Sequence, residues 1–418
     1  MIDTKTDVLV IGGGAAGMAA AAAASNAGAQ TLLLERDNEV GGVLNQCIHT
    51  GFGLHRYHEE LAGPEFGHRL LAELAATEAE VVSGCSVLNI DPEKHIIEGI
   101  SKTGRVRIAT RALVWASGAR ERPYGSLMAP GPRPAGIYTA GLAQRFVNIH
   151  GFLPGRRAVI LGSGDIGLIM ARRLYLEGMD VAAVVELQPV PGGLMRNVVQ
   201  CLEDFDIPLL LSHSIVEVEG RERLAGVTIA RVDESRRPIP GTEQHFAVDT
   251  LILSIGLIPE NELILPFTSI DPVNRGPRVN SLMQTDVPWL FAAGNNIAVF
   301  DLVDSVAAVG EIAGRSAALH AQRKLRHGHS ARLVRGERVS HLVPTSLVGG
   351  EGPTKIYLRA SRAMRQATLR IGGAVSGDIT SRKLPVVRPS EMIEVRISQE
   401  ELARLTREKE VRIEVIES

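Results

Sequence analysis

Apolar residues gather in short runs along the chain, and the runs stop at glycine, a pattern that predicts short strands. The first run, residues 7–11, leads into the glycine-rich turn Gly12–Gly17 and then into a helix of small residues that ends near Gly28. Residues 30–34 form a second apolar run, which Glu35 closes. Because a strand, a glycine turn, a helix and a strand follow one another directly, the segment predicts a β-α-β unit.

The same pattern recurs in the second quarter of the chain. Its parts are an apolar run over 158–161, the turn Gly162–Gly167, a helix over 168–177 that ends at Gly178, and a strand over 181–185 closed by Glu186. The repeat therefore indicates an internal duplication of one supersecondary unit, and not an array of short repeats.

Further strands are predicted between and after the two copies, over 81–90, 106–116, 226–232 and 246–255. The breaker-rich stretch Pro123–Pro134 indicates a domain crossing. From Ala331 onwards the pattern changes, because segments such as 355–359 and 392–397 alternate like strands and are separated by glycine and proline. We therefore expect residues 331–418 to form a separate β-rich domain, and this domain carries no chemical motif.

The composition is typical of a globular enzyme with more than one domain. The chain has 418 residues, which is too long for one ordinary core, and 45% of them are apolar and 22% charged. The net charge of −2 gives no basic field for nucleic acid, and 4% aromatic residues argue against a base-stacking surface. No apolar run reaches the ~18–20 residues of a membrane span.

The three cysteines, Cys47, Cys85 and Cys201, show neither a disulfide framework nor the spacing of zinc ligands. Unpaired cysteines are typical of a reducing compartment, so a cytoplasmic location is expected. His49, His55 and His58 lack cysteine or carboxylate companions at ligand spacing, so no metal site is expected. His55 and His58 are predicted on a surface helix with the acidic residues 59 and 60.

Each glycine turn has the spacing of a dinucleotide-binding fingerprint. In Gly-x-Gly-x-x-Gly the first glycine permits the tight turn, the second lets the backbone approach a pyrophosphate, and the third lets helix and strand pack closely. The free N–H groups at the start of the helix then face the phosphates. Glu35 lies 18 residues after Gly17, and Glu186 lies 19 after Gly167, where a carboxylate accepts hydrogen bonds from a ribose. The alternative interpretation is an ordinary glycine turn beside a surface glutamate.

Three other segments fit the same plan. Residues 116–118 (Ala-Ser-Gly) end an apolar strand at which backbone would pack against a bound nucleotide, and residues 251–256 repeat this pattern after the second turn. Residues 285–295 predict a strand that ends in a polar residue and is followed by an apolar helix. Asp165, at the start of the second helix, suits the positive end of the helix dipole and is interpreted as structural rather than catalytic.

Together these motifs resemble the two-dinucleotide-binding flavoproteins that include the pyridine nucleotide-disulfide oxidoreductases, from Asp7 to Leu325. Within that superfamily the chain is most similar to bacterial NAD(P)/FAD-dependent oxidoreductases associated with glycerol-3-phosphate dehydrogenase. This closer likeness is carried by Gly41–His49, Gly51–His55, Gly162–Arg172, Ile207–His213, Asp301–Asp304 and Arg388–Met392. Thr139-Ala140-Gly141 and Gln144 are similar to opine oxidase and hydrogen cyanide synthase subunits.

The resemblance implies an α/β fold with two Rossmann-like dinucleotide-binding domains, the NAD domain being inserted in a split FAD domain, and a smaller β-rich C-terminal domain. It places the FAD domain in residues 1–122 and 265–330, the NAD domain in residues 123–264 and the C-terminal domain in residues 331–418. FAD and NAD(H) are the implied cofactors.

The implied cofactor contacts fall into two sets. The FAD set is Gly12, Gly14, Ala15, Ala16, Gly17, Glu35, Arg36, Gly41, Gly42, Val43, Asn45, Gln46, Val87, Ala116, Ser117, Gly118, Gly294 and Asn295. The NAD set is Gly162, Gly164, Asp165, Ile166, Gly167, Glu186 and Gly256. Asn295 stands where the superfamily usually has aspartate; an amide still donates and accepts hydrogen bonds but carries no charge.

The segment after Gly42 supplies the candidate catalytic residues, Cys47 and His49. Disulfide reductases carry a cysteine pair in this segment, whereas the matching positions here are Leu44 and His49, so a redox disulfide within it is excluded. Cys47 is either a thiolate beside the flavin or a small buried side chain without a redox role. His49 is a candidate hydrogen-bond or proton donor beside the flavin.

The leading functional hypothesis is electron transfer, in which NADH and FAD exchange a hydride and the flavin passes electrons to or from a partner. By resemblance the partner is a glycerol-3-phosphate-oxidising subunit, docked on residues 331–418. A thiol or peroxide reductase that uses Cys47, and a non-catalytic FAD-binding assembly subunit, are the alternatives. The sequence leaves open whether residues 331–418 instead pair two copies of the chain in a homo-oligomer.

Coenzyme and substrate preferences also follow from charged positions. The carboxylate of Glu186 should repel a 2′-phosphate, and the next residues, Leu187 and Gln188, supply no arginine to bind one, which favours NADH over NADPH. Between residues 45 and 58 Arg56 is the only arginine. A phosphate ester is normally held by several cationic donors, so no glycerol 3-phosphate site is expected in this segment. The alternative is that distant arginines, such as Arg120 or Arg122, complete such a site in the fold.

Overall fold

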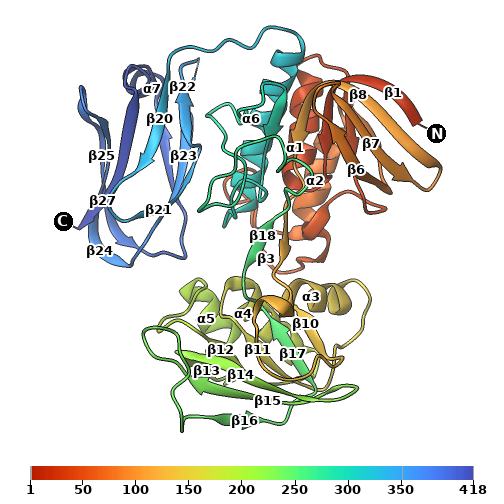
Figure 1. Ribbon diagram of the computed structural model, residues 1–418, viewed down its shortest axis with the longest axis vertical. Coiled ribbons are helices and arrows are strands. Elements are labelled where there is room, and N and C mark those ends of the chain that lie inside the picture. The colour runs from red at the N-terminus through yellow and green to blue at the C-terminus, as the bar shows by residue number, and fades with distance from the viewer. Residues whose placement is uncertain (1, 351, 418) are drawn as a thin grey trace. The chain divides into compact units, whose positions relative to one another are not determined.

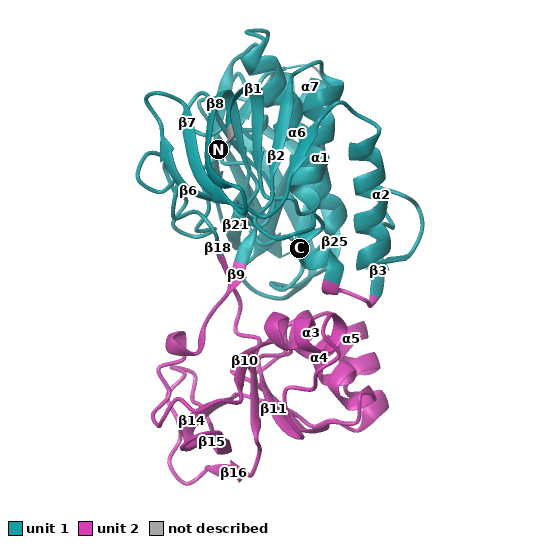
Figure 2. Ribbon diagram, turned by 90° about the vertical axis from the view of Figure 1, so that its right-hand side faces the viewer, with its two compact units in different colours: residues 1–45, 50–119, 259–418 teal, residues 46–49, 120–258 magenta. Residues whose placement is uncertain are grey.

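The computed structural model describes residues 2–350 and 352–417 (Figure 1). These residues form two compact units, shown in teal and magenta in Figure 2. The first unit comprises the residues up to Asn45, Thr50–Ala119 and the residues from Pro259 onwards. The second comprises Gln46–His49 and Arg120–Ile258.

The first unit is built on a seven-stranded sheet in the order β5-β2-β1-β8-β7-β6, in which β19 also pairs with β8. Its strands are β1 (Ile2–Ile11), β2 (Thr31–Leu34), β5 (Glu80–Val82), β6 (Cys85–Asp91), β7 (Ile96–Ser101), β8 (Gly104–Trp115) and β19 (Leu290–Ala292). β1 pairs in parallel with β2 and with β8, so that Ile11 lies opposite both Leu34 and Trp115. The residues that follow these strand ends therefore meet at one edge of the sheet.

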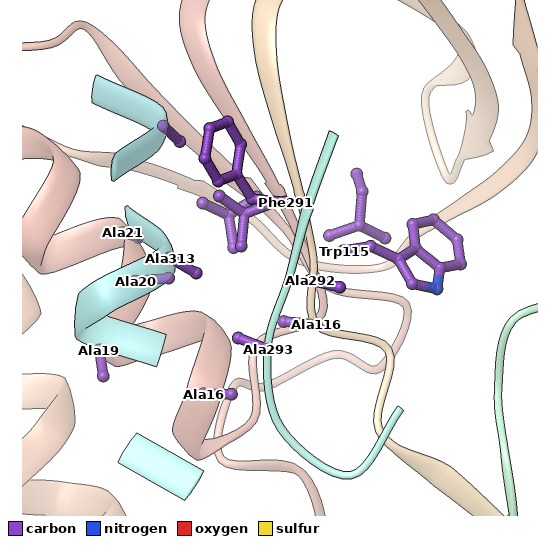
Figure 3. Packing of buried hydrophobic residues seen from close by; sticks show 14 of the residues in the cluster. Ala16, Ala19, Ala20, Ala21, Trp115, Ala116, Phe291, Ala292, Ala293 and Ala313 are labelled. Carbon is purple, nitrogen blue, oxygen red and sulfur yellow. The ribbon is translucent and has the colours of Figure 1, made fainter. Parts of the chain in front are cut away.

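Two helices of small residues lie against each other in this unit, α1 (Ala15–Asn26) and α6 (Val303–Ala321). An added Cβ at Gly310 would lie 2.3 Å from the Ala16 carbonyl oxygen, and one at Gly314 would lie 1.9 Å from that of Ala20. Figure 3 shows the alanine side chains of both helices beside the strand ends at Ala116 and Ala292. Only glycine at the contact allows so close an approach of the backbones. A third helix, α2 (Gly63–Ala75), also packs on α1.

The strand expected over 81–90 is two strands, because the chain turns at Gly84 with φ of +66° between β5 and β6. The surface helix expected around His55 and His58 is wrong: these residues lie in turns between β3 (Thr50–Phe52) and β4 (Leu61–Ala62), and His58 has φ of +56°. A left-handed residue cannot continue a right-handed helix, so the local polarity of the segment was misleading.

The second unit contains a five-stranded parallel sheet in the order β10-β17-β11-β12-β13 and a three-stranded antiparallel sheet, β14-β15-β16. The strands are β10 (Ile137–Thr139), β11 (Arg157–Leu161), β12 (Asp180–Glu186), β13 (Leu209–Leu211), β14 (His213–Gly220), β15 (Leu224–Arg231), β16 (Gln244–Phe246) and β17 (Thr250–Leu253). The helices are α3 (Ala140–Asn148), α4 (Asp165–Leu176) and α5 (Met195–Cys201). The strand expected over 246–255 is therefore divided between β16 and β17. β9 (Ala119–Glu121) pairs with β18 (Leu257–Pro259).

The C-terminal part of the first unit is rich in β-structure, as expected. Two sheets, β22-β20-β27-β24-β25 and β21-β23-β26, enclose a hydrophobic core of their own. The elements are β20 (Ser330–Arg335), β21 (Val339–Val343), β22 (Ser346–Val348), β23 (Thr354–Ala360), β24 (Met364–Gly373), β25 (Gly377–Val387), β26 (Ile393–Ile397), β27 (Glu410–Glu417) and α7 (Gln399–Leu405). Arg335 joins this part to the rest of the unit by an ion pair with Asp271 of 2.6 Å.

The α/β architecture with a duplicated β-α-β unit and a β-rich C-terminal part confirms the fold class expected from the sequence. Among the described residues, no helix has both the length and the apolar character that a membrane crossing requires.

Candidate dinucleotide-binding sites

The first glycine turn follows β1 and begins α1. Gly12 has φ of +101°, and a Cβ there would lie 2.4 Å from the Ala116 carbonyl oxygen. A Cβ at Gly17 would lie 1.7 Å from the carbonyl oxygen of Gly12, whereas one at Gly14 meets no atom within 4 Å. The first and third glycines are thus required by the protein's own packing. The second leaves an open face at the start of a 12-residue helix, as a bound pyrophosphate requires.

The second turn repeats this geometry between β11 and α4. Gly162 has φ of +102°, and its added Cβ would lie 2.1 Å from the Ser254 carbonyl oxygen. A Cβ at Gly167 would lie 2.3 Å from the carbonyl oxygen of Gly162, and the nearest atom to one at Gly164 is 3.9 Å away. Both turns therefore have the shape that a dinucleotide needs.

The two acidic residues are held by the turns themselves. The Glu35 carboxylate, 7% exposed, accepts the backbone N–H of Gly13 over 2.6 Å and that of Asp37 over 2.7 Å. Glu186, 8% exposed, accepts the backbone N–H of Ser163 over 2.9 Å and that of Gln188 over 2.8 Å. An ionised carboxylate has about four lone-pair sites, so each keeps the capacity to accept from a ribose hydroxyl.

The other candidates in the turns differ in exposure. Ala15 and Ala16 are buried in the first turn of α1, Ile166 is half-buried in α4, and Arg36 is exposed beyond Glu35. Val87 is half-buried in β6. Asp165 accepts the backbone N–H of Leu194 over 2.8 Å and the side-chain amide of Asn197 over 2.6 Å, which supports its structural interpretation.

The Gly41-Gly42 pair lies across the first turn. The Gly41 N–H donates to the Gly13 carbonyl oxygen over 2.8 Å, and a Cβ at Gly42 would lie 3.2 Å from the Cα of Gly14. The Asn45 side-chain amide donates to the Val40 carbonyl oxygen over 3.0 Å, and Val43 beside it is 62% exposed. Gly41 and Gly42 thus place backbone atoms, without side chains, next to Gly14.

Residues that follow β8, β17 and β19 also lie at the carboxyl ends of the parallel strands. Ser117 donates its hydroxyl to the Glu260 carbonyl oxygen over 2.5 Å. Gly118 and Gly256 occupy matching positions after β8 and β17, with φ of +72° and +95°. Gly294 has φ of +91°, and its added Cβ would lie 2.8 Å from that of Ala16.

Asn295, which follows Gly294, uses its side-chain oxygen within the protein. That oxygen accepts the backbone N–H of Phe300 over 3.1 Å, so it holds the loop between β19 and α6. Neighbouring Asn296 is fully buried and donates to the Trp115 carbonyl oxygen over 3.0 Å. No sequence signal pointed to Asn296, which fixes the β19 loop to β8.

Cys47 lies in the second unit, among polar side chains of α3. Its thiol sulfur is 3.7 Å from the side-chain oxygen of Gln144, which also accepts from the Gln46 amide over 3.1 Å. Burial raises the pKa of the Cys47 thiol to about 12, so the neutral thiol is favoured over the thiolate. His49 is half-buried in the same short segment. Within the described residues no three His, Cys, Asp or Glu side chains are grouped as a metal site would need.

Sequence reasoning missed the role of Asp304. Its buried carboxylate accepts three backbone N–H groups, from Gly53 over 3.2 Å, His55 over 3.1 Å and Arg56 over 2.8 Å. Gly53, His55 and Asp304 lie in two segments that carry the resemblance, Gly51–His55 and Asp301–Asp304, but nothing in the sequence joined these segments. An aspartate at the start of an apolar helix is the only local signal.

Arg56 is fully engaged inside the first unit. Its guanidinium forms ion pairs with Glu73 of α2 over 2.5 Å and with Glu311 of α6 over 2.7 Å. Arg56 therefore links α2 to α6, because it forms an ion pair with one carboxylate on each helix.

Comparisons with known proteins identify a family for most of the chain. The profile of the family described as pyridine nucleotide-disulphide oxidoreductase matches residues 6–310. An opine oxidase subunit of Agrobacterium tumefaciens is 25% identical over 62% of this chain and 53% of the relative. The alpha subunit of sarcosine oxidase from a Corynebacterium species is 27% identical over 62% of this chain and 27% of the relative. The chain thus matches about half the length, or less, of these relatives.

Among solved structures, thioredoxin reductase of Lactococcus lactis superposes with a TM-score of 0.62 at 21% sequence identity. The superposition covers 76% of this chain and 99% of that chain. At this identity the likeness shows the fold alone.

Proposed function

Because the chain belongs to the pyridine nucleotide-disulphide oxidoreductase family, we propose that it exchanges a hydride between NADH and FAD and passes electrons to or from a separate subunit. The family consists of FAD-binding, NAD(P)H-using oxidoreductases, which supports an FAD-dependent NAD(P)H oxidoreductase activity for this chain.

The observation that carries the proposal is the equivalence of the two glycine turns. Each turn has two positions that only glycine can occupy and a third glycine, at the start of a helix, with open space beside it. Each turn also binds one buried carboxylate through a backbone N–H. A chain with two such turns has positions for two adenine dinucleotides. When bound, FAD and the nicotinamide coenzyme supply the hydride chemistry, and the protein positions them.

We assign the first turn to FAD and the second to the nicotinamide coenzyme. The N–H groups at the start of α1 and the open face of Gly14 would hold the FAD pyrophosphate, and Glu35 would accept from its ribose. In the second turn the start of α4, Gly164 and Glu186 would do the same for the coenzyme. Gly41, Gly42 and Gly294 would line the FAD side with backbone.

NADH is the proposed coenzyme because Glu186 is buried and the two residues that follow it, Leu187 and Gln188, carry no cation to bind a 2′-phosphate. A 2′-phosphate beside a desolvated carboxylate brings two like charges together, at a cost of about 1–3 kcal/mol, or roughly tenfold to a hundredfold in affinity. NADH, which has a free 2′-hydroxyl, can instead donate to the carboxylate.

A partner protein is proposed because the relatives from opine oxidase and sarcosine oxidase are subunits by name. The sequence resemblance suggests a glycerol-3-phosphate-oxidising partner, docked on residues 331–418. The ion pairs of Arg56 support a substrate site on the partner and not on this chain. Because Arg56 is paired with Glu73 and Glu311, its charge is not available to bind a phosphate ester. A cytoplasmic location, which the three free cysteines favour, belongs to the same proposal.

The isolated chain should therefore not bind glycerol 3-phosphate. Calorimetry and dye-linked kinetics with this compound on the purified chain test the point. Saturable turnover without a second protein would place the substrate site here and contradict the partner proposal.

The alternative of a thiol or peroxide reductase loses support from Cys47. A catalytic thiol must ionise near neutral pH, and burial raises the pKa of this thiol to about 12. The hydride exchange itself needs no thiol.

The proposal is tested by purifying the chain, measuring the released flavin by chromatography and following coenzyme oxidation with an artificial electron acceptor. FAD close to one equivalent and a higher kcat/KM for NADH than for NADPH are expected. FMN in place of FAD, or equal use of NADPH, would contradict the assignment of the turns or of Glu186.

A further inference from the structure

We infer that Gly192 and Gly193 form one wall of the nicotinamide coenzyme site, as the counterpart in the second copy of Gly41 and Gly42 in the first. The inference rests on the proposed use of the second turn for a nicotinamide dinucleotide. It adds a loop to that site, residues 190–197, which lies outside the glycine fingerprint.

The first observation is that the duplication extends beyond the β-α-β unit. Gly41-Gly42 follow Glu35 after five intervening residues, and Gly192-Gly193 follow Glu186 after five. The two acidic residues also make the same local bond, since each accepts the backbone N–H two residues later, over 2.7 Å in the first copy and 2.8 Å in the second. The loops therefore leave the two strands in the same way.

The second observation is that each glycine pair lies across its own turn. The Gly41 N–H donates to the carbonyl oxygen of Gly13 over 2.8 Å, and the Gly192 N–H donates to the hydroxyl of Ser163 over 2.8 Å. Ser163 occupies the position in the second turn that Gly13 occupies in the first. A Cβ at Gly193 would lie 2.8 Å from the Asp165 carboxylate and 3.0 Å from its backbone nitrogen.

The polar residues of the second turn hold this loop in place. Ser163 donates its hydroxyl hydrogen to Glu186 over 2.6 Å while its oxygen accepts from Gly192. Asp165 accepts from the Leu194 N–H and from the Asn197 amide. The first turn has glycine and alanine at the matching positions, so these side-chain bonds are specific to the second copy.

The third observation is where Gly192 points. A Cβ added there would lie 3.5 Å from the Gly164 nitrogen and 3.7 Å from a Glu186 carboxylate oxygen. These are the two groups that the proposed function assigns to the pyrophosphate and to the adenosine ribose. Gly192 thus borders the space between them, and the absence of a side chain keeps that space open for the ribose-phosphate part of the coenzyme.

The test is Gly192→Ala. Its Cβ would make only ordinary van der Waals contacts, and the φ of Gly192 lies outside the left-handed region, so the variant should fold. We expect the dissociation constant for NAD⁺, measured by calorimetry, and the KM for NADH to rise about fivefold or more. The kcat and the FAD content should stay close to those of the wild type.

Gly125→Ala is the matched control. Gly125 lies in the same unit, and its added Cβ would meet only the guanidinium of Arg133, at 3.5 Å. It should bind NAD⁺ as the wild type does. A second variant, Asn197→Ala, loosens the loop from Asp165 without adding any atom, and we expect it to weaken NAD⁺ binding about twofold or more at an unchanged melting temperature.

An unchanged or lower dissociation constant in Gly192→Ala overturns the inference, as does normal binding in Asn197→Ala if Gly192→Ala fails to fold. Failure of the proposed function gives a different result, because the wild type itself would then neither bind NAD⁺ nor oxidise NADH.

Discussion

The carboxylate of Glu35 accepts the backbone N–H of Gly13 over 2.6 Å, in the middle of the first glycine turn. Glu186 makes the same contact with Ser163 in the second turn, over 2.9 Å. The ribose acceptor and the phosphate-binding backbone of each site are thus joined directly. Such a connection pre-organises both halves of a dinucleotide site before any ligand arrives.

The first prediction separates binding from folding within one turn. Gly14→Ala should fold normally, because its Cβ meets no atom within 4 Å, but its methyl group would face the pyrophosphate and reduce FAD occupancy about tenfold or more. Gly17→Ala is the contrast, because its Cβ would lie 1.7 Å from the Gly12 carbonyl oxygen and must disrupt the turn. Released flavin and thermal unfolding of both variants check this. A Gly14→Ala protein that retains full FAD would remove the first turn from the FAD site.

The second prediction concerns coenzyme choice. Glu186→Gln keeps an oxygen for the Ser163 N–H but removes the charge that repels a 2′-phosphate. The preference for NADH over NADPH should therefore shrink by about tenfold, or about 1.4 kcal/mol. The ratio of the two kcat/KM values, wild type against variant, is the measurement. An unaltered ratio would mean that Glu186 does not set the preference.

The third prediction concerns Cys47. Its thiol is buried and its pKa is raised to about 12, so Cys47→Ser should retain NADH-to-dye activity within a few-fold of the wild type. A loss of more than about a hundredfold in turnover, which corresponds to about 2.7 kcal/mol of barrier, with FAD still bound, would restore the thiol mechanism.

The same pKa predicts how stability changes with pH. The folded thiol keeps its proton at pH values where the unfolded thiol, with an ordinary pKa of 9.0, has lost it. This contribution is complete below that value and is lost as the pH rises toward about 12, by up to about 1.4 kcal/mol per pH unit. Urea unfolding at about pH 8 and about pH 10.5 should show a larger alkaline loss for the wild type than for Cys47→Ser. Equal losses would mean that this thiol ionises freely in the folded protein.

The sequence predicted the parts of the site that depend on neighbouring residues. The glycine turns, the helix starts and the acidic strand ends are local patterns, and all occur where they were expected. The contacts of Asp304 could not be predicted, because its N–H donors lie about 250 residues earlier in the chain. Those donors come from the turns that replace the helix expected at His55 and His58.

The burial of individual side chains also could not be predicted from the sequence. Cys47 could be interpreted either as a thiolate or as a small buried side chain, and only its position beside Gln144 of α3 favours the second. The strand expected over 81–90 was divided by one left-handed glycine, Gly84, whose role an apolar pattern does not reveal.

The fourth prediction tests the long-range contact. Asp304→Ala leaves three backbone N–H groups of residues 53–56 without their acceptor and should lower the free energy of unfolding by about 2–4 kcal/mol. Glu311→Ala is the control on the same helix: its side chain is 45% exposed and its ion pair with Arg56 should contribute about 1 kcal/mol or less. Denaturant unfolding of both variants, with FAD saturation held equal, makes the comparison. Similar losses in the two would show that the Asp304 bonds are not important for stability.

Anaerobic titration with NADH, followed through the flavin absorbance, tests the central claim most directly, namely that one chain holds FAD and a nicotinamide coenzyme in two equivalent turns and transfers a hydride between them. The account predicts that FAD-loaded protein bleaches with about one equivalent of NADH, because both carry two electrons. It also predicts that Gly192→Ala needs a higher NADH concentration to reach the same rate of bleaching. Protein that contains FAD but does not bleach with NADH would contradict the account and leave only the role of a non-catalytic FAD-binding subunit.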